Sequence, residues 1–201
     1  MSKDFALILT AAGKSERFNN GEKGAKKEYS LINGKSIVRM ALDAFLPLPE
    51  LRRVVITVPK GGEKEMKTSL GEIDSEIPIA FIEGGPSRTQ SISHAMEYLS
   101  SFFDYSLIAI HDGARPFIDR DTICNCLYAA NSYGGAIPGI RVADAMKRAD
   151  EEAFIVSSVD RNGVYVMGTK TGFVNEFKLG IYAYESIINT QKAANYENFL
   201  N

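Results

Sequence analysis

Short runs of apolar residues alternate along this chain with longer segments in which apolar residues recur at helical spacing. The short runs are bounded by Gly, Pro or Asp, and the segments with helical spacing lie between them. The runs predict buried strands at Phe5–Thr10, Arg53–Pro59, Ile77–Ile82 and Leu107–His111, and the spaced segments predict helices at Ser36–Leu46, Arg88–Leu99 and Asp121–Ser132. This order is typical of a three-layer α/β fold, in which helices cover both faces of a mostly parallel, twisted sheet. We expect Asp121 to cap the last helix.

The region from Arg141 to Thr171 has a different pattern. Polar and apolar residues alternate from Val142 to Arg148, an acidic turn follows, and Phe154–Val159 again resembles a strand. The pattern predicts a protruding antiparallel arm. An exposed hairpin with apolar side chains is often an oligomer contact, and an ordinary edge hairpin is the alternative.

The length of 201 residues predicts a single domain over residues 1–201, with the arm at about 141–171. A formal net charge of -2 gives no broad positive field, so we expect neither a nucleic-acid partner nor a membrane surface. No segment approaches the ~18 apolar residues of a membrane span, and the N-terminal sequence leads too directly into a strand to be a secretion signal, which predicts a cytoplasmic protein. Cys124 and Cys126 are interpreted as small buried hydrophobes rather than a metal pair.

The loop that follows the first strand is the first candidate site, because ligands of an open parallel sheet bind at the carboxyl ends of its strands. Its small residues let backbone N–H groups approach phosphate oxygens. Downstream, Arg17 offers a planar fork for a triphosphate and Lys27 a compact charge. Lys23 and Lys26 are interpreted as solvated. The small residues of the loop are Ala11, Ala12 and Gly13, and Gly21 and Gly24 predict a flexible lid.

Two features of the chain imitate a P-loop kinase. Gly13-Lys-Ser15 resembles the end of a P-loop, and Ile108–Asp112 resembles the strand whose terminal Asp holds magnesium. The P-loop spacing requires a glycine where Ile8 stands, and no dinucleotide-binding glycine fingerprint follows the first strand. A P-loop kinase therefore remains only as an alternative of a different class, which phosphate transfer from ATP would reveal.

Six motifs occur in an order that resembles the sugar-phosphate nucleotidyltransferases, and among them the 2-C-methyl-D-erythritol 4-phosphate cytidylyltransferase family. The resemblance extends from about Phe5 to Thr169 and implies a Rossmann-like nucleotidyltransferase fold. The motifs are Leu9-Thr-Ala-Ala-Gly with Arg17 and Lys27-Glu-Tyr, Leu31-Ile-Asn-Gly-Lys-Ser-Ile-Val38, Gly84-Gly-Pro-Ser-Arg-Thr-Gln-Ser91, His111-Asp-Gly-Ala-Arg-Pro-Phe117, Gly135-Ala-Ile-Pro with Asp144-Ala-Met-Lys-Arg148, and Val159-Asp-Arg-Asn-Gly163.

The resemblance implies a role for each matching position. Arg17 and Lys27 would be catalytic and would contact the triphosphate of CTP, while Asp112 would bind Mg²⁺. The implied nucleotide contacts are Ala11, Ala12, Gly13, Gly85, Arg88, Ser91 and Gly113. The implied contacts of the methylerythritol phosphate are Arg161 and Thr169, with Arg115 as a structural or phosphate-facing arginine. The family is homodimeric through its arm, so Arg161 would serve the neighbouring subunit. Without the family pattern, Arg161 could equally pair with Asp160 or Asp144.

The implied reaction is in-line attack by the polyol's phosphate oxygen on the α-phosphorus of CTP, which expels pyrophosphate. Because this nucleophile is already an anion at neutral pH, positioning and charge stabilisation suffice without a catalytic base. His94 and His111 are therefore expected to take no part in the reaction. His111 precedes Asp112 on a strand, so the two side chains should point to opposite faces of the sheet.

The chain departs from the family pattern at several positions. Lys26 stands where the family has Pro, Ala145 where it has Thr, and Lys170-Thr171 where it has Pro-Gln. An Asn-x-Lys-Ile-Thr segment is absent from the sequence. These departures keep two alternatives open, a ribitol-5-phosphate cytidylyltransferase and a nucleotide-binding protein without turnover.

Overall fold

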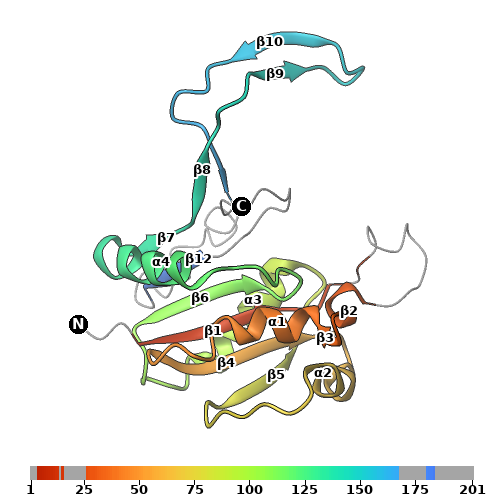
Figure 1. Cartoon of the computed structure of the whole chain (residues 1–201), viewed down its shortest axis with the longest axis vertical. Helices are drawn as coiled ribbons and strands as arrows, with labels where there is room; N and C mark the ends of the chain where they lie inside the picture. Colours follow the sequence, from red (N-terminus) through yellow and green to blue (C-terminus); the bar gives the residue numbers. More distant parts are fainter. Residues whose placement is uncertain (1–3, 14, 16–25, 168–179, 184–201) are drawn as a thin grey trace.

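A six-stranded sheet forms the centre of the molecule in the computed structural model, which describes residues 4–13, 15, 26–167 and 180–183 (Figure 1). The strands lie in the order β5-β4-β1-β6-β12-β7. Their bounds are β5 Ile79–Glu83, β4 Leu51–Val58, β1 Phe5–Thr10, β6 Leu107–Asp112, β12 Gly180–Ala183 and β7 Gly135–Ala136. The first four strands of this order are parallel, and β12 runs antiparallel to both of its neighbours.

Helices cover both faces of the sheet, as the hydrophobic pattern predicts. On one face, α1 (Ile37–Asp43), α2 (Glu63–Leu70) and α4 (Arg120–Tyr133) pack on a core that contains alternate residues of β1. On the other face, α3 (Arg88–Leu99) packs on the remaining residues of β1. The alternation is the period of a strand buried on both faces. Because α3 follows the parallel strand β5 after a short loop, its first turn lies at the carboxyl end of the sheet.

The strands and helices predicted from the sequence are present, and the structure differs from the prediction at several points. The helix α2 has only two buried apolar side chains in eight residues, Met66 and Leu70, so its period was not recognised. The N-cap of α4 is Asp119 and not Asp121, because the Asp119 carboxylate accepts the backbone N–H of Thr122. Strand β12 was not predicted either.

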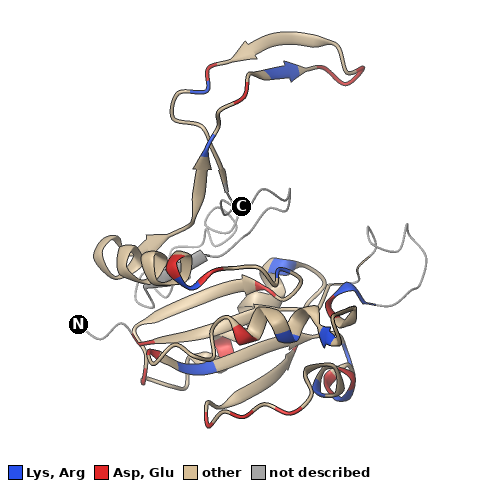
Figure 2. Cartoon of the chain, in the orientation of Figure 1, with Lys and Arg blue, Asp and Glu red and all other residues tan. Residues whose placement is uncertain are grey.

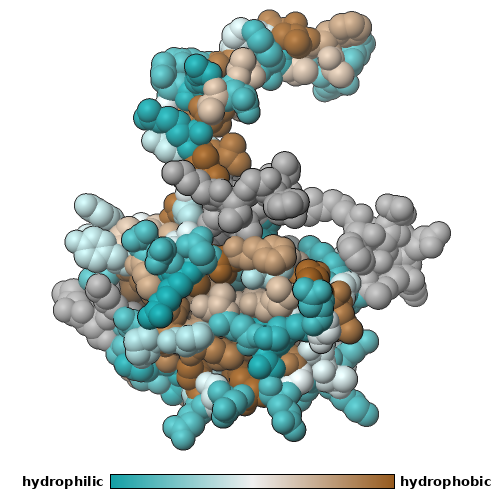
Figure 3. Space-filling model, viewed as in Figure 1, coloured by the Kyte–Doolittle hydropathy of each residue, from teal (hydrophilic) through white to brown (hydrophobic). Residues whose placement is uncertain are grey.

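The arm leaves the body as a pair of antiparallel ladders (Figure 1). Strand β8 (Gly139–Arg141) pairs with β11 (Tyr165–Met167), and farther out β9 (Met146–Ala149) pairs with β10 (Ile155–Val159). The predicted antiparallel arm is therefore confirmed up to residue 167, and its last predicted residues lie outside the described part. Figure 3 shows hydrophobic residues on the surface of the arm, and Phe154 and Ile155 are largely exposed.

Charges of both signs are interspersed over the body on the face that Figure 2 shows, in keeping with the small net charge. Within the described residues, every helix is too short or too polar to cross a membrane. Cys126 is buried in the core as predicted, whereas Cys124 is exposed because it lies on the outer face of α4. The prediction of two buried cysteines was therefore wrong for Cys124.

A short 3₁₀ helix, η1 (Lys27–Tyr29), leads into a small hairpin of β2 (Leu31–Ile32) and β3 (Lys35–Ser36). The hairpin turns at Asn33 and Gly34, both of which have positive φ. Ser36 then caps α1 by accepting the backbone N–H of Arg39. This connection brings η1 to the same end of the molecule as the loop after β1.

Candidate functional site

The carboxyl ends of β1 and β6 meet at the topological switch point of the sheet. From β1 the chain builds β4 and β5 on one side and then crosses to add β6 on the other side. Ligands of open α/β sheets bind in the crevice outside such a point. Thr10 and Asp112 are register partners at these ends, and the Thr10 hydroxyl donates to Asp112 Oδ1 at 3.0 Å. The candidate site is therefore the end of the sheet where Thr10 and Asp112 meet.

The loop after β1 is held by side chains of other elements. The Ala11 N–H donates to Thr57 Oγ1 at 3.1 Å, and Thr57 is fully buried on β4. The Ala11 carbonyl accepts the Lys26 ammonium at 2.6 Å. Lys26 is therefore half-buried and bonded to this loop, and not a fully solvated lysine as the sequence suggests. The sequence alone does not reveal that residues 11 and 26 are in contact. Gly13 has open space around its Cα.

Small residues let three chain segments approach one another at this edge. A Cβ atom on Gly84 would lie 2.2 Å from the Ala12 Cβ and 2.7 Å from the Ser91 Oγ. A Cβ atom on Gly113 would lie 3.2 Å from the Ala11 Cβ. Glycine is therefore required at residue 84 by close packing, which the motif alone did not explain.

The segment before α3 is organised by hydrogen bonds within it. Ser87 and Gln90 form a capping box, and Arg88 is the first residue of the helix. The buried Ser91 hydroxyl accepts the Gly85 N–H at 3.1 Å and donates to the Ser87 carbonyl at 2.9 Å. Ser91 therefore shapes the turn that presents Gly85, and its predicted contact with the nucleotide stays a prediction.

Asp112 is bound by two arginines. Arg115 Nε donates to Asp112 Oδ2 at 2.8 Å, and the Arg88 guanidinium contacts Oδ1 at 3.2 Å. Burial alone would raise the pKa of Asp112, but the positive charges of Arg88 and Arg115 and the Thr10 hydrogen bond hold it below its usual value. The carboxylate is therefore ionised at neutral pH, beside two cations that can also contact phosphate.

The donor set suits a magnesium ion that substrate phosphates would share. Among the described residues, no three His, Cys, Asp or Glu side chains are grouped as a metal site. Mg²⁺ is often held by one or two carboxylates together with substrate phosphates and water, so a single carboxylate is compatible with it. The Asp112 carboxylate is ionised and lies next to the loop of residues 11–13. It is the residue here that fits this role.

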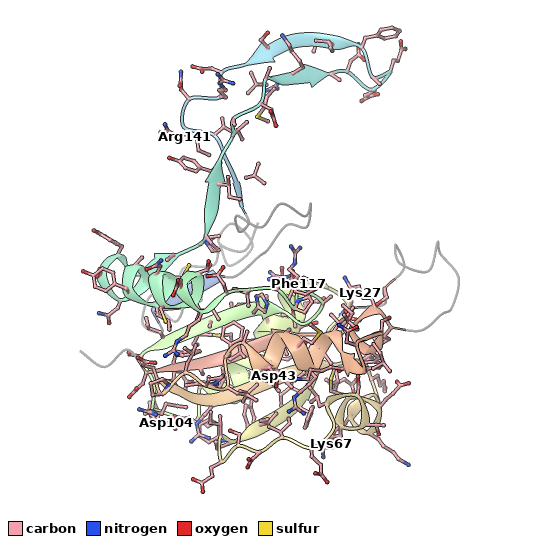
Figure 4. The ribbon with its side chains drawn as sticks, viewed as in Figure 1. Lys27, Asp43, Lys67, Asp104, Phe117 and Arg141 are labelled. Atoms are coloured by element: carbon pink, nitrogen blue, oxygen red, sulfur yellow. The ribbon has the colours of Figure 1, made fainter. Side chains whose placement is uncertain are left out.

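Lys27 begins η1, and its backbone is tied to the loop after β1. The Lys27 N–H donates to Ser15 Oγ at 3.3 Å, and Ser15 donates in turn to the buried Glu28 carboxylate at 3.1 Å. Ser15 has a φ of 54°, in the left-handed region. Figure 4 shows Lys27 at the upper edge of the body. Arg17, Lys23, Gly21 and Gly24 lie outside the described residues.

His111 belongs to the core. Its side chain is fully buried against Phe45, with ring centroids 5.3 Å apart, on the face of the sheet opposite to α3. Nε2 donates to the Arg115 carbonyl at 2.9 Å, while Nδ1 has no partner among the described residues. Burial lowers the pKa of His111 to about 4, so it is neutral at pH 7. His94 is exposed on α3 and contacts the Glu83 carbonyl.

Of the two arm residues with implied roles, only Arg161 lies in the described part of the chain, and its recorded contact is within the arm. Arg161 donates to the Ala143 carbonyl, and none of the ion pairs found among the described residues joins it to Asp160 or Asp144. Arg161 is exposed and lies between β10 and β11 of the arm. Thr169 lies outside the described residues. The structure therefore brings together the loop after β1, the 84–91 segment, the 112–115 turn and η1, but not Arg161.

Comparison with known proteins points to one family. The profile of the 2-C-methyl-D-erythritol 4-phosphate cytidylyltransferases matches residues 5–196. The cytidylyltransferase of that name from Bacillus mycoides is 30% identical over 169 residues, which is 84% of this chain and 72% of the relative. The bifunctional enzyme IspD/IspF of Rhizobium rhizogenes is 32% identical over 170 residues, or 83% of this chain. This chain spans only 41% of that bifunctional relative.

Solved structures share the fold at low sequence identity. The 4-diphosphocytidyl-2C-methyl-D-erythritol synthase of Anaerococcus prevotii matches with a TM-score of 0.74 and 20% identity, over 100% of this chain and 78% of that one. The 2-C-methyl-D-erythritol 4-phosphate cytidylyltransferase of Francisella tularensis matches with a TM-score of 0.71 and 16% identity, over 98% of this chain and 80% of that one. The fold predicted from the sequence is confirmed.

Proposed function

Because this chain belongs to the 2-C-methyl-D-erythritol 4-phosphate cytidylyltransferase family, we propose that it transfers the cytidylyl group of CTP to 2-C-methyl-D-erythritol 4-phosphate. The products would be the CDP-polyol and pyrophosphate, in non-mevalonate isoprenoid biosynthesis. The observation that carries the proposal is the convergence, at the switch point, of a small-residue loop with Asp112, Arg88 and Arg115. Loop amides and arginines are groups that bind phosphates well.

The site suits a reaction without a general base. The substrate phosphate is already an anion and can attack the α-phosphorus directly, so the protein has to orient it and offset developing charge. The buried histidine nearest the site is neutral and directed into the core, which is consistent with this scheme. We propose Lys27, together with Arg17, as the groups that stabilise charge on the α-phosphate and the leaving pyrophosphate.

We propose Asp112 as the protein ligand of Mg²⁺. The ion would supply positive charge to the triphosphate and the departing pyrophosphate. Arg88 and Arg115, which bind Asp112 in the structure, are then available to nearby phosphate oxygens. The nucleotide contacts proposed here are Ala11, Ala12, Gly13, Gly85, Arg88, Ser91 and Gly113, with Arg115 on the phosphate side.

The arm supports the further proposal of a homodimer in which Arg161 and Thr169 hold the methylerythritol phosphate of the neighbouring subunit. Arg161 lies on the arm, and the arm exposes apolar side chains such as Phe154 and Ile155. Apolar surface of this kind is often covered by a partner. We also propose that residues 1–201 act as one domain in the cytoplasm, with the arm at about 141–171.

Pyrophosphate release is the experiment that tests the activity. The purified chain is incubated with CTP and Mg²⁺, with methylerythritol 4-phosphate or ribitol 5-phosphate as acceptor, and then with ATP in place of CTP. We expect release that depends on CTP and methylerythritol 4-phosphate. A preference for ribitol 5-phosphate, release only with ATP, or CTP binding without turnover would each reject the proposed reaction.

Asp112→Asn tests the metal proposal with a matched control. The variant keeps the shape of the side chain but removes its charge, so Mg²⁺-dependent turnover should fall by at least about 10²-fold. Asp104→Asn is the control, because Asp104 also pairs with an arginine, Arg53, but lies away from the site in Figure 4. Equal activities of the two variants would remove Asp112 from the reaction.

A further inference from the structure

Lys26 makes a contact that a solvated lid lysine would not make. Its ammonium bonds the Ala11 carbonyl at 2.6 Å, and the Ala11 N–H is bonded to the buried Thr57. Both backbone polar groups of Ala11 are therefore held by side chains from other parts of the chain. These bonds set the orientation of the Ala11 peptide groups before any ligand binds. They thereby also help to orient the backbone amides of the next residues.

A second bridge lies beside the first. Lys27 N–H and the Glu28 carboxylate both bond the Ser15 hydroxyl. Residues 26 to 28 thus contact the loop after β1 at two places, Ala11 and Ser15. Because Lys26 directly precedes Lys27, the contact to Ala11 also fixes where the proposed catalytic lysine stands relative to the loop.

The surroundings of the ammonium favour this fixed position. Burial lowers the pKa of Lys26, the neighbouring Lys27 lowers it further, and Glu28 and Glu65 raise it. The Tyr29 ring centroid lies 5.6 Å from the Lys26 Nζ. A partly desolvated ammonium needs such partners, and the carbonyl of Ala11 is the one that it bonds.

From these contacts we propose that Lys26 is a positioning residue, which holds the nucleotide loop and Lys27 in register for the triphosphate of CTP. The ammonium acts through Ala11 and does not itself need to touch the nucleotide, since it is already bonded to the carbonyl. This inference rests on the proposed function. It adds a residue whose side chain the sequence assigns to solvent.

Three substitutions separate the ammonium from the backbone. Lys26→Met keeps most of the chain length without the charge, and Lys26→Arg keeps a charged donor. Lys26→Pro removes the side-chain donor but suits the local backbone, because Lys26 has a φ of -71°. Lys64→Met is the control, since Lys64 is exposed on α2 and outside the site.

Steady-state kinetics and calorimetry of CTP binding provide the first readout. Loss of one charged hydrogen bond should raise the KM for CTP, and the Kd of CTP, about tenfold in Lys26→Met and Lys26→Pro. The kcat should also fall, because Lys27 is less well positioned, but by less than in Lys27→Ala, because Lys27 itself is retained. Lys26→Arg should recover most of the CTP affinity, and Lys64→Met should match the wild type. Unchanged KM and Kd in Lys26→Met would overturn the proposal.

Amide hydrogen exchange of the ligand-free protein provides a readout that does not depend on turnover. The amides of Ala12 and Gly13 should exchange faster in Lys26→Met than in the wild type, and Lys26→Arg should restore their protection. If the variants show these differences in exchange but the wild type does not bind CTP, the proposed function fails while the loop contact stands. Lys26 is then not a residue of CTP binding. Equal exchange in all variants would show that the loop does not need the ammonium.

Discussion

At the carboxyl ends of β1 and β6 the side chains are bonded to one another and to the sheet, whereas the arm turns most of its side chains to solvent. The single carboxylate of Asp112, for example, is bonded to Thr10, Arg88 and Arg115. In the arm, by contrast, Phe154 is 67% exposed and Ile155 is 69% exposed. The difference is in keeping with the proposed division of roles, in which one chain forms the nucleotide half of the site, here called the preformed half, and the arm contacts a neighbouring subunit.

Replacing Lys27 should have the largest effect, because it removes a charge from the preformed half. We expect Lys27→Ala to lower kcat by at least about 10²-fold, the scale for losing one preorganised electrostatic group. Single-turnover pyrophosphate release with saturating CTP measures the loss. Lys35→Ala serves as the control, since Lys35 is exposed and pairs with Asp43. Near-normal turnover of Lys27→Ala would remove its catalytic role.

Gly84 tests how closely the preformed half is packed. The Cβ of Gly84→Ala would meet the Ala12 Cβ at 2.2 Å, so we expect a loss of about 2 kcal/mol in the free energy of unfolding. CTP affinity should fall with it, because the loop must shift. Gly13→Ala is the matched variant, with open space and an unchanged unfolding free energy expected. Urea unfolding distinguishes the two, and equal stabilities would contradict the packing.

His111, which lies beneath the preformed half, makes the free energy of unfolding depend on pH. Burial lowers its pKa from the usual 6.5 to about 4, so between these values the unfolded chain binds more protons than the folded one. Stability contributed by neutral His111 is therefore present at pH 7 and falls as the pH drops towards 4, by about 2 kcal/mol at pH 5. His111→Gln should remove this part of the acid sensitivity in urea unfolding at both pH values. The exposed His94→Gln should leave it, and equal pH profiles of wild type and His111→Gln would contradict the burial effect.

Substitutions in the arm should have the smallest effect on folding. For Phe154→Ser combined with Ile155→Ser, the unfolding free energy of the monomer should change by no more than about 0.5 kcal/mol, because both side chains are exposed. Sedimentation should nevertheless show a shift from dimer to monomer, together with reduced turnover. Phe103→Ser, at an exposed site in the body, should leave the dimer intact. An unchanged dimer in the arm variant would show that these arm side chains do not form the dimer contact.

The central strands and α3 could be predicted because their apolar residues follow a single period. Phe5–Thr10 and Arg88–Leu99 have the predicted bounds in the structure. The helix α2 escaped prediction because six of its eight residues are not buried, which leaves too little periodicity to recognise. Two aspartates lie within three residues at the start of α4, and only the observed hydrogen bond to Thr122 identifies Asp119 as the cap.

The candidate site was predictable where a motif directly names its residues. Asp112 and the loop after β1 follow from strand ends and the resemblance, and the structure brings them together. Lys26 could not be found in this way, because its partner Ala11 is distant in sequence and the contact exists only in the folded chain. The same is true of Thr57, whose buried hydroxyl near the carboxyl end of β4 accepts the Ala11 N–H.

The close approach of Gly84 to Ala12 and Ser91 also means that substitutions at these three positions depend on one another. The three residues share a space with no room for another methyl group. A lineage that enlarges one of them should persist only if another becomes smaller. Ala12 lies far from Gly84 and Ser91 in the sequence, so we expect its side-chain size to vary together with theirs among descendants of this protein.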